Sequence, residues 1–201
     1  MKQPTEFILA SASPRRKLLL ERAGYRFEVI PSEVDEEAFD GAAMDAAETA
    51  RQLALAKALD VAAGHPARLV LGADTVVDLD GRKIGKPADA EEAEAITRAL
   101  FSRPHKVITG VALVCMDRGI EIAETDTTIV YPKMLTEAQI AEHIVGGNWK
   151  GKAGAYGIQE SGDAFVERIE GSFTNVMGLP MERVELLLSE LSIAGPADAG
   201  G

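Results

Sequence analysis

The sequence contains one cysteine and three histidines among its 201 residues. Cys115 lies within the apolar stretch VALVCMD, so we expect a buried core thiol, and a disulfide framework is excluded. His65, His105 and His143 occur in unrelated contexts, without the spacing of metal ligands or of a histidine that activates a nucleophile. These absences argue against a disulfide-stabilised module, a zinc site and a cysteine–histidine catalytic site.

Positive charge and long apolar runs are also scarce. The formal net charge of −11 argues against a protein that coats nucleic acid. No run of about 18 apolar residues is present, so no membrane span is expected. The N-terminal MKQPTEF lacks the apolar core of a secretory signal, and we therefore expect a cytoplasmic protein. A small anionic ligand would need a local pocket where the few basic residues converge.

The length and the 46% hydrophobic content suit one α/β domain over residues 1–193. The tail AGPADAGG, residues 194–201, lacks apolar anchors and is expected to be disordered. Helical and alternating segments together predict a mixed twisted sheet flanked by helices. We expect strands at residues 7–10, 27–31, 68–79, 82–84, 105–116, 120–131 and 164–171, and helices at 14–23, 45–63, 90–100, 136–145 and 180–191.

The stretch ILASASPRRKLLLERAG predicts a strand, a tight turn and a leucine-rich helix. Ser13 is the expected N-cap and Pro14 the first helical residue, followed by Arg15 and Arg16. A helix N-terminus is partially positive, so each cation there costs about 0.3–1 kcal/mol. A bound anion would reverse that cost, and the pair of arginines therefore predicts an anion site at this turn.

Asp74 ends the apolar run LVLGAD, where a carboxylate beside the core is costly without a partner. Asp80 and Gly81 predict a two-residue hairpin turn, whose pairing would return Lys86 beside Thr75. Alternatively, Asp74 is a strand-end residue bonded to backbone and Lys86 a solvated one. The hairpin favours a shared site for these side chains.

Lys57 lies on the apolar face of its expected helix, where it could extend to solvent or pair with Asp60. Asp35, in the acidic loop PSEVDEE, could likewise be ordinary solvated surface. The glycine-rich segment 146–159 contains G-x-x-x-x-G-K, but Ala153 stands where a phosphate-binding P-loop has Ser or Thr. A P-loop is therefore rejected, while close backbone approach or a structural turn cluster stays open.

The unusual positions make chemical sense as one site. Hydroxyls, helix-terminal N–H groups and cations can hold a polyphosphate, while carboxylates can hold a divalent metal or deprotonate a water. The candidates are Ser11, Ser13, Arg15, Arg16, Lys57 and Lys86, together with the acids Asp35 and Asp74.

The motifs SASPRR, GADTVV, GKP, KAGAYGIQ and IEGSFTNVMGLP resemble, in this order, those of the Maf family of nucleoside triphosphate pyrophosphatases. The resemblance extends from Ile8 to Pro180. It implies a fold like that of the inosine triphosphate pyrophosphatases, with two lobes around a nucleotide cleft. It also implies hydrolysis of a nucleoside triphosphate to the monophosphate and pyrophosphate, a divalent metal such as Mg or Mn, and a homodimer.

The same resemblance assigns roles to individual residues. Asp74 corresponds to the proton acceptor, and Asp35 with Asp74 would hold the metal. Four polar and basic positions match and would bind phosphate: Ser13, Arg16, Lys57 and Lys86. Ser11, a hydroxyl of the same turn, is a further candidate for phosphate binding.

Arg15, Thr75 and Gln159 resemble the positions that distinguish family members acting on dTTP and UTP. A sister group acting on 7-methyl-GTP has Trp, Gln and Glu there. An amide at Gln159 can donate and accept hydrogen bonds, as a uracil or thymine edge requires. One departure is Gly151, where many members have an acidic residue. The alternatives are a pyrophosphatase for modified purine nucleotides and a nucleotide-binding regulator of cell division that needs no catalysis.

Overall fold

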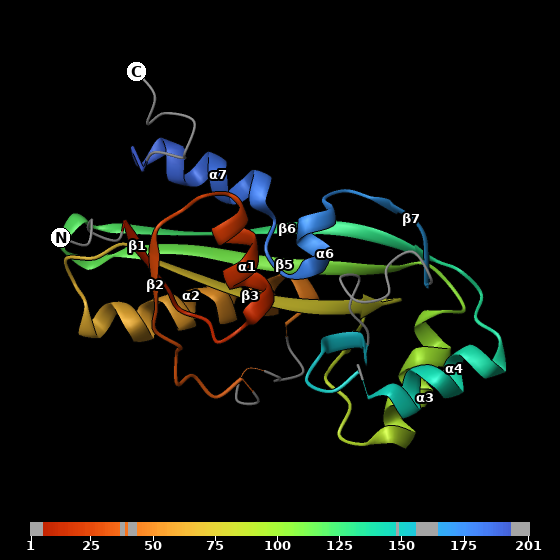
Figure 1. Ribbon diagram of the computed structural model, residues 1–201. Helices are drawn as coiled ribbons and strands as arrows, with labels where there is room; N and C mark the ends of the chain where they lie inside the picture. The colour runs from red at the N-terminus through yellow and green to blue at the C-terminus, as the bar shows by residue number, and fades with distance from the viewer. Residues whose placement is uncertain (1–5, 37–38, 40–43, 148, 156–164, 194–201) are drawn as a thin grey trace.

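The computed structural model describes residues 6–36, 39, 44–147, 149–155 and 165–193 (Figure 1). A seven-stranded sheet has the order β2-β1-β3-β5-β6-β7, and β4 pairs with the later residues of β3, on the edge that β1 also uses. β1 is parallel to β2 and β3, whereas the other pairs are antiparallel. The predicted mixed α/β fold is confirmed. The predicted tail, 194–201, and Gln159 lie outside the described residues.

The strands follow the predicted segments: β1, β2, β3, β5 and β7 are one or two residues shorter at an end, β4 matches, and β6 is one residue longer. The Asp80-Gly81 turn is confirmed: both residues have positive φ, and Val77 pairs with Ile84. The bounds are β1 (Phe7–Leu9), β2 (Phe27–Val29), β3 (Val70–Leu79), β4 (Arg82–Ile84), β5 (His105–Cys115), β6 (Ile120–Pro132) and β7 (Val166–Glu170).

The predicted helices are present, and side-chain caps start most of them, as Ser13 and Asp45 do for the first two. The helix α6 was not predicted. Among the described residues, no helix is both long and apolar enough to cross a membrane. The bounds are α1 (Pro14–Arg22), α2 (Ala46–Gly64), α3 (Ala90–Leu100), α4 (Glu137–Gly146), α6 (Phe173–Met177) and α7 (Met181–Glu190), with 3-10 turns η2 (Met116–Arg118) and η3 (Ala153–Ala155).

Helices cover both faces of the sheet (Figure 1). Side chains alternate along a strand, so Phe7 and Leu9 pack with α1 and α7, whereas Ile8 packs with α2. Figure 1 shows α3 and α4 together at the far end of the long strands. Residues of both helices pack in a separate apolar cluster with Trp149. This arrangement gives a larger helix-covered part and a smaller one at the end of the sheet.

Two glycines let α2 lie directly on the sheet. A Cβ at Gly72 would lie 2.2 Å from the carbonyl oxygen of Ala54, and one at Gly110 would lie 2.1 Å from that of Ala50. The facing side of α2 carries small residues, so its backbone contacts β3 and β5 closely. This close approach places Lys57, from the same helix, over β3.

We predict that Gly110→Ala destabilises the fold by about 3 kcal/mol, because α2 must move away from the sheet to admit the methyl group. The measurement is the free energy of unfolding in urea. Gly64→Ala is the matched control, since a Cβ there meets nothing within 4 Å. Equal stability of the two variants would contradict the packing described here.

Candidate active site

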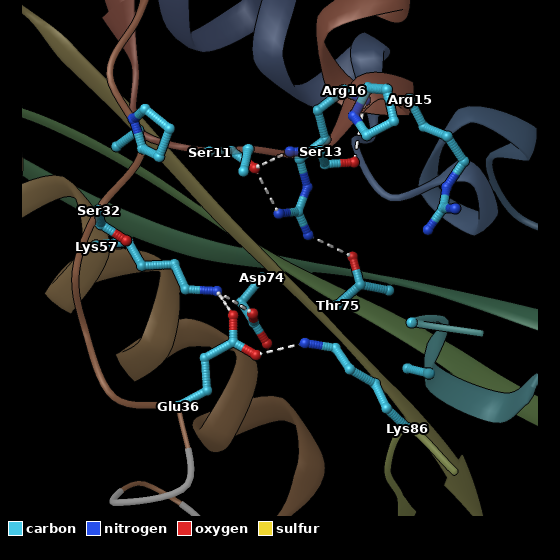
Figure 2. A pocket seen from close by; sticks show the side chains of 16 residues that line it. Ser11, Ser13, Arg15, Arg16, Ser32, Glu36, Lys57, Asp74, Thr75 and Lys86 are labelled. Atoms are coloured by element: carbon cyan, nitrogen blue, oxygen red, sulfur yellow. Dashed lines mark hydrogen bonds and ion pairs between the residues drawn. The ribbon is translucent and has the colours of Figure 1, made fainter. Parts of the chain in front are cut away.

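A cleft opens where the edge of β3 lacks a strand partner. Along this edge, β3 pairs with β1 as far as Leu71 and with β4 from Val77 onward, and the described residues place no strand in between. The gap exposes Asp74 and Thr75 to a cleft of about 360 Å³ (Figure 2). A second cavity of about 310 Å³ shares Glu36, Lys86 and both of these residues, and adds Thr49, Leu53 and Lys83. The cleft is called the first compartment and the second cavity the second compartment. Asp74 lines both, so it lies where they meet.

The turn from β1 into α1 forms one wall. The Ser13 hydroxyl caps the helix by accepting from the backbone N–H of Arg16 at 3.5 Å, and the Ser13 N–H donates to Ser11 Oγ at 3.2 Å. The Arg16 guanidinium donates from Nη1 to Ser11 Oγ at 3.1 Å and from Nη2 to Thr75 Oγ1 at 3.1 Å. Its Nε donates to the carbonyl oxygen of Gly178 at 2.8 Å. The side chain is therefore fixed on three sides.

Arg16 is a buried cation whose hydrogen bonds within the described part of the chain all go to uncharged oxygens. Burial lowers the pKa of Arg16, chiefly by desolvation, against a raising effect of Asp74, yet arginine keeps its charge in proteins. A desolvated guanidinium without a bonded carboxylate favours an incoming anion.

The end of α6 explains how the two arginines tolerate the start of α1. Arg15 Nε donates to the carbonyl oxygen of Met177 at 3.3 Å, next to the Gly178 carbonyl that accepts from Arg16. Carbonyls at a helix C-terminus lack intrahelical donors and carry partial negative charge. One helix end therefore offsets the repulsion at the other.

A second group of side chains joins two carboxylates through lysines (Figure 2). Lys57 Nζ donates to Asp74 Oδ1 and to Glu36 Oε1, each at 2.6 Å, and Lys86 Nζ donates to Glu36 Oε2 at 2.7 Å. Lys57 and Asp74 are 6% and 8% exposed, so this pair is protected from solvent. Asp60, the alternative partner of Lys57, instead accepts from the backbone N–H of Glu33.

Glu36 is the carboxylate that sequence reasoning missed. Desolvation raises its pKa, but hydrogen bonds and charges from Lys57 and Lys86 outweigh that effect and lower the pKa to about 2. Asp35, the predicted acid, is exposed and lines neither compartment. Neighbouring acids in an irregular loop carry no periodicity, so the sequence contains no signal that separates them.

Most predicted site residues come together at the cleft. Four cationic and two carboxylate side chains line the first compartment, a local positive surplus in a chain of net charge −11. Among the described residues, no group of three or more His, Cys, Asp or Glu side chains is arranged to hold a metal ion. The predicted residues lining the compartment are Ser11, Ser13, Arg15, Arg16, Lys57, Asp74, Thr75 and Lys86.

Comparison with known proteins identifies the family. The family model described as Maf-like protein matches residues 6–191. The chain belongs to the Maf family. Its relatives include a protein named dTTP/UTP pyrophosphatase from Moorella thermoacetica, 45% identical over 92% of this chain and 94% of that protein. A protein of the same name from Symbiobacterium thermophilum is 43% identical over 98% of both chains. Another, from Bacillus cytotoxicus, is 44% identical over 89% and 92%.

The pKa of Glu36 predicts an acid-sensitive contribution to stability. Its folded value of about 2 lies below the ordinary 4.5, so the ionised group stabilises the fold above pH 4.5 and loses this effect as pH falls toward 2. In Glu36→Gln, the free energy of unfolding should therefore fall less steeply over this interval. Glu33→Gln, an exposed acid of the same loop, is the control. Identical pH slopes in parent and Glu36→Gln would be evidence against the two lysine contacts.

Proposed function

We propose that this chain hydrolyses dTTP and UTP to the nucleoside monophosphate and pyrophosphate. The Maf-family match and the names of the relatives support this reaction. The observation that carries it structurally is the junction at Asp74, where a lysine-bound carboxylate adjoins a compartment with surplus positive charge. A polyphosphate held there would present a phosphorus atom to the carboxylate.

The wall of the cleft formed by the turn from β1 into α1, which carries Arg15 and Arg16, binds the phosphates. The backbone N–H groups at the start of α1 and the hydroxyls of Ser11 and Ser13 are uncharged. They add directional hydrogen-bond donors around a polyanion. Arg16 has five N–H groups, of which three are bonded within the described residues. One N–H on each terminal nitrogen remains for phosphate oxygens, as a bidentate contact requires.

Asp74 accepts a proton from the attacking water. Lys57 holds one carboxylate oxygen at 2.6 Å, which fixes the group while its other oxygen stays available for the water. Lys86 reaches the same junction from the segment after β4 and adds positive charge there. Both ammonium groups stabilise negative charge that develops as pyrophosphate leaves.

The carboxylates of Asp74 and Glu36 fit a divalent cation such as Mg or Mn. Both bond the same Lys57 ammonium, so they converge on one point from β3 and from the loop after β2. Mg is commonly held by one or two carboxylates together with substrate phosphates, which agrees with a two-carboxylate set. A bound ion would supply shielding of the phosphate charge. The assignment of Asp35 as a ligand stays a prediction.

Choice of the base is proposed to involve Arg15, Thr75 and Gln159. Arg15 lines the cleft and is half-buried. The hydroxyl of Thr75 accepts a hydrogen bond from Arg16, so Thr75 also helps to orient the guanidinium that binds phosphate. The role of Gln159, the homodimer and the cytoplasmic location stay predictions.

A nucleotide panel tests the reaction. With dTTP, UTP, CTP, ITP and 7-methyl-GTP at equal concentration and Mg or Mn present, we expect pyrophosphate to be released fastest from dTTP and UTP. A chelator should stop the release, and added metal should restore it. Preference for 7-methyl-GTP or ITP would support the purine alternative, whereas no release from any nucleotide would favour a regulator without catalysis.

Asp74→Asn should lower kcat by at least about a hundredfold, because an amide cannot accept the proton of the water. The measured quantity is pyrophosphate released from dTTP, with the thermal unfolding midpoint as a check on folding. Asp78→Asn is the matched control: Asp78 lies on the same strand, is 9% exposed, and caps the backbone N–H of Gly81 outside the cleft. Parent-like turnover in Asp74→Asn would refute the assignment.

A further inference from the structure

A chain of hydroxyls leads inward from Arg16, from the half-buried Thr75 to the buried Thr109. Thr75 and Thr109 are directly opposite on the antiparallel strands β3 and β5, and their hydroxyl oxygens lie 3.0 Å apart. Thr109 also donates to the carbonyl oxygen of Asn175, in α6, at 3.3 Å. Thr109 is fully buried and lines neither compartment of the cleft. It therefore cannot touch substrate directly.

Proton counting links the directions of these hydrogen bonds. Each hydroxyl has a single proton. When Thr109 donates to the Asn175 carbonyl it accepts from Thr75, and when it donates to Thr75 the Thr75 proton goes to the Gly178 carbonyl, 3.4 Å away. Thr75 in turn accepts from Arg16 Nη2 at 3.1 Å. When Thr109 donates to the Asn175 carbonyl, every donor in the series points away from the guanidinium, an arrangement in which successive hydrogen bonds polarise one another.

The series of hydrogen bonds that leaves Arg16 through Thr75 and Thr109 ends at α6, whose C-cap residue is also bonded to Arg16. Arg16 Nε donates to Gly178, which follows the helix that contains Asn175. Asn175 is fixed to the sheet, since its Nδ2 donates to the carbonyl oxygen of Val107 at 3.0 Å and to Thr128 Oγ1 at 2.9 Å. The contacts of the guanidinium with Gly178 and Thr75 are therefore both linked to Asn175, which is buried and bonded to the sheet.

We propose that Thr109 is a positioning residue for phosphate recognition, acting through Thr75 to set the orientation of Arg16. Without the hydroxyl of Thr109, Thr75 loses its partner at 3.0 Å and can turn toward the Gly178 carbonyl, 3.4 Å away. That carbonyl already accepts from Arg16 Nε, so the two donors would compete. The inference rests on the proposed function, because Arg16 is taken to bind the triphosphate.

The test combines a shape-conserving variant with a rescue. In Thr109→Val, kcat/KM for dTTP should fall about tenfold, mainly through a higher KM, and by the same factor for UTP. Thr109→Ser restores the hydroxyl and should lie within about twofold of the parent. Thr97→Val is the control, since Thr97 is equally buried and its hydroxyl donates to the Ala93 carbonyl of its own helix, α3. Its kcat/KM should equal that of the parent.

A double-mutant cycle separates positioning from a general loss of stability. Combined with Arg16→Lys, Thr109→Val should cause little further loss, because lysine cannot make the contact that Thr109 orients. A full and independent loss in that background, or parent-like kinetics in Thr109→Val alone, would overturn the proposal. If Thr109→Val does not fold, Thr109→Ser and Arg16→Lys provide the test. A parent-like KM in Thr109→Ser together with a strongly raised KM in Arg16→Lys would support the requirement for the hydroxyl. A raised KM in Thr109→Ser would refute the proposal.

Pyrophosphate binding, measured by calorimetry, gives a second readout that needs no turnover. Thr109→Val should weaken pyrophosphate binding by about the same factor as it raises KM. If the parent binds pyrophosphate but hydrolyses no nucleotide, the proposed function is refuted. Pyrophosphate affinities of the parent and the Thr109 variants then still test the positioning role of Thr109. Unchanged pyrophosphate affinity in Thr109→Val would refute the positioning role whatever the enzyme activity.

Discussion

The buried pair of Lys57 and Asp74 is the interaction on which the arrangement of the cleft depends. Taking both charges out of water is costly, and removal of one partner from such a pair costs about 3–5 kcal/mol. The pair can form only because α2 lies directly on β3 and β5, where Gly72 and Gly110 leave room for its backbone. The core packing of α2 and the placement of the Asp74 carboxylate are thus one structural requirement. A hydrophobic replacement could pack as well, so the pair is better explained by chemistry than by stability.

Alternation along β3 distributes two tasks to opposite faces of one strand. Asp74 faces α2 and its lysine, whereas Thr75 faces α6 and the guanidinium of Arg16. Both reach the same cleft because β1 ends before this point and β4 starts after it. The carboxylate of Asp74 can therefore lie near the guanidinium of Arg16 while its hydrogen bond comes from Lys57 and those of Arg16 go to hydroxyls and a carbonyl.

Local rules predicted most elements of this fold. The Ser13 cap, the Asp80-Gly81 turn and the alternation of β3 depend on neighbouring residues, and the sequence contains those neighbours. Glu36 was missed because choosing it over Asp35 depends on where an irregular loop passes Lys57, which lies 21 residues away. α6 was missed because five residues are too few for a periodic pattern, and its role depends on contacts with Arg15 and Arg16 across 162 residues. Hydroxyl chains such as that of Thr109 require strand register, which alternation alone leaves open.

The charge balance of the cleft explains how an acidic protein can hold a polyanion. Lys57 and Lys86 are bonded to the carboxylates of Asp74 and Glu36, so these four side chains are close to neutral as a group. The surplus is carried by Arg15 and Arg16, whose partners are carbonyls and hydroxyls. Such neutral acceptors orient a guanidinium without cancelling its charge. Binding and reaction are therefore assigned to separate clusters, and the orientation of the first depends on α6, an element far from it in sequence.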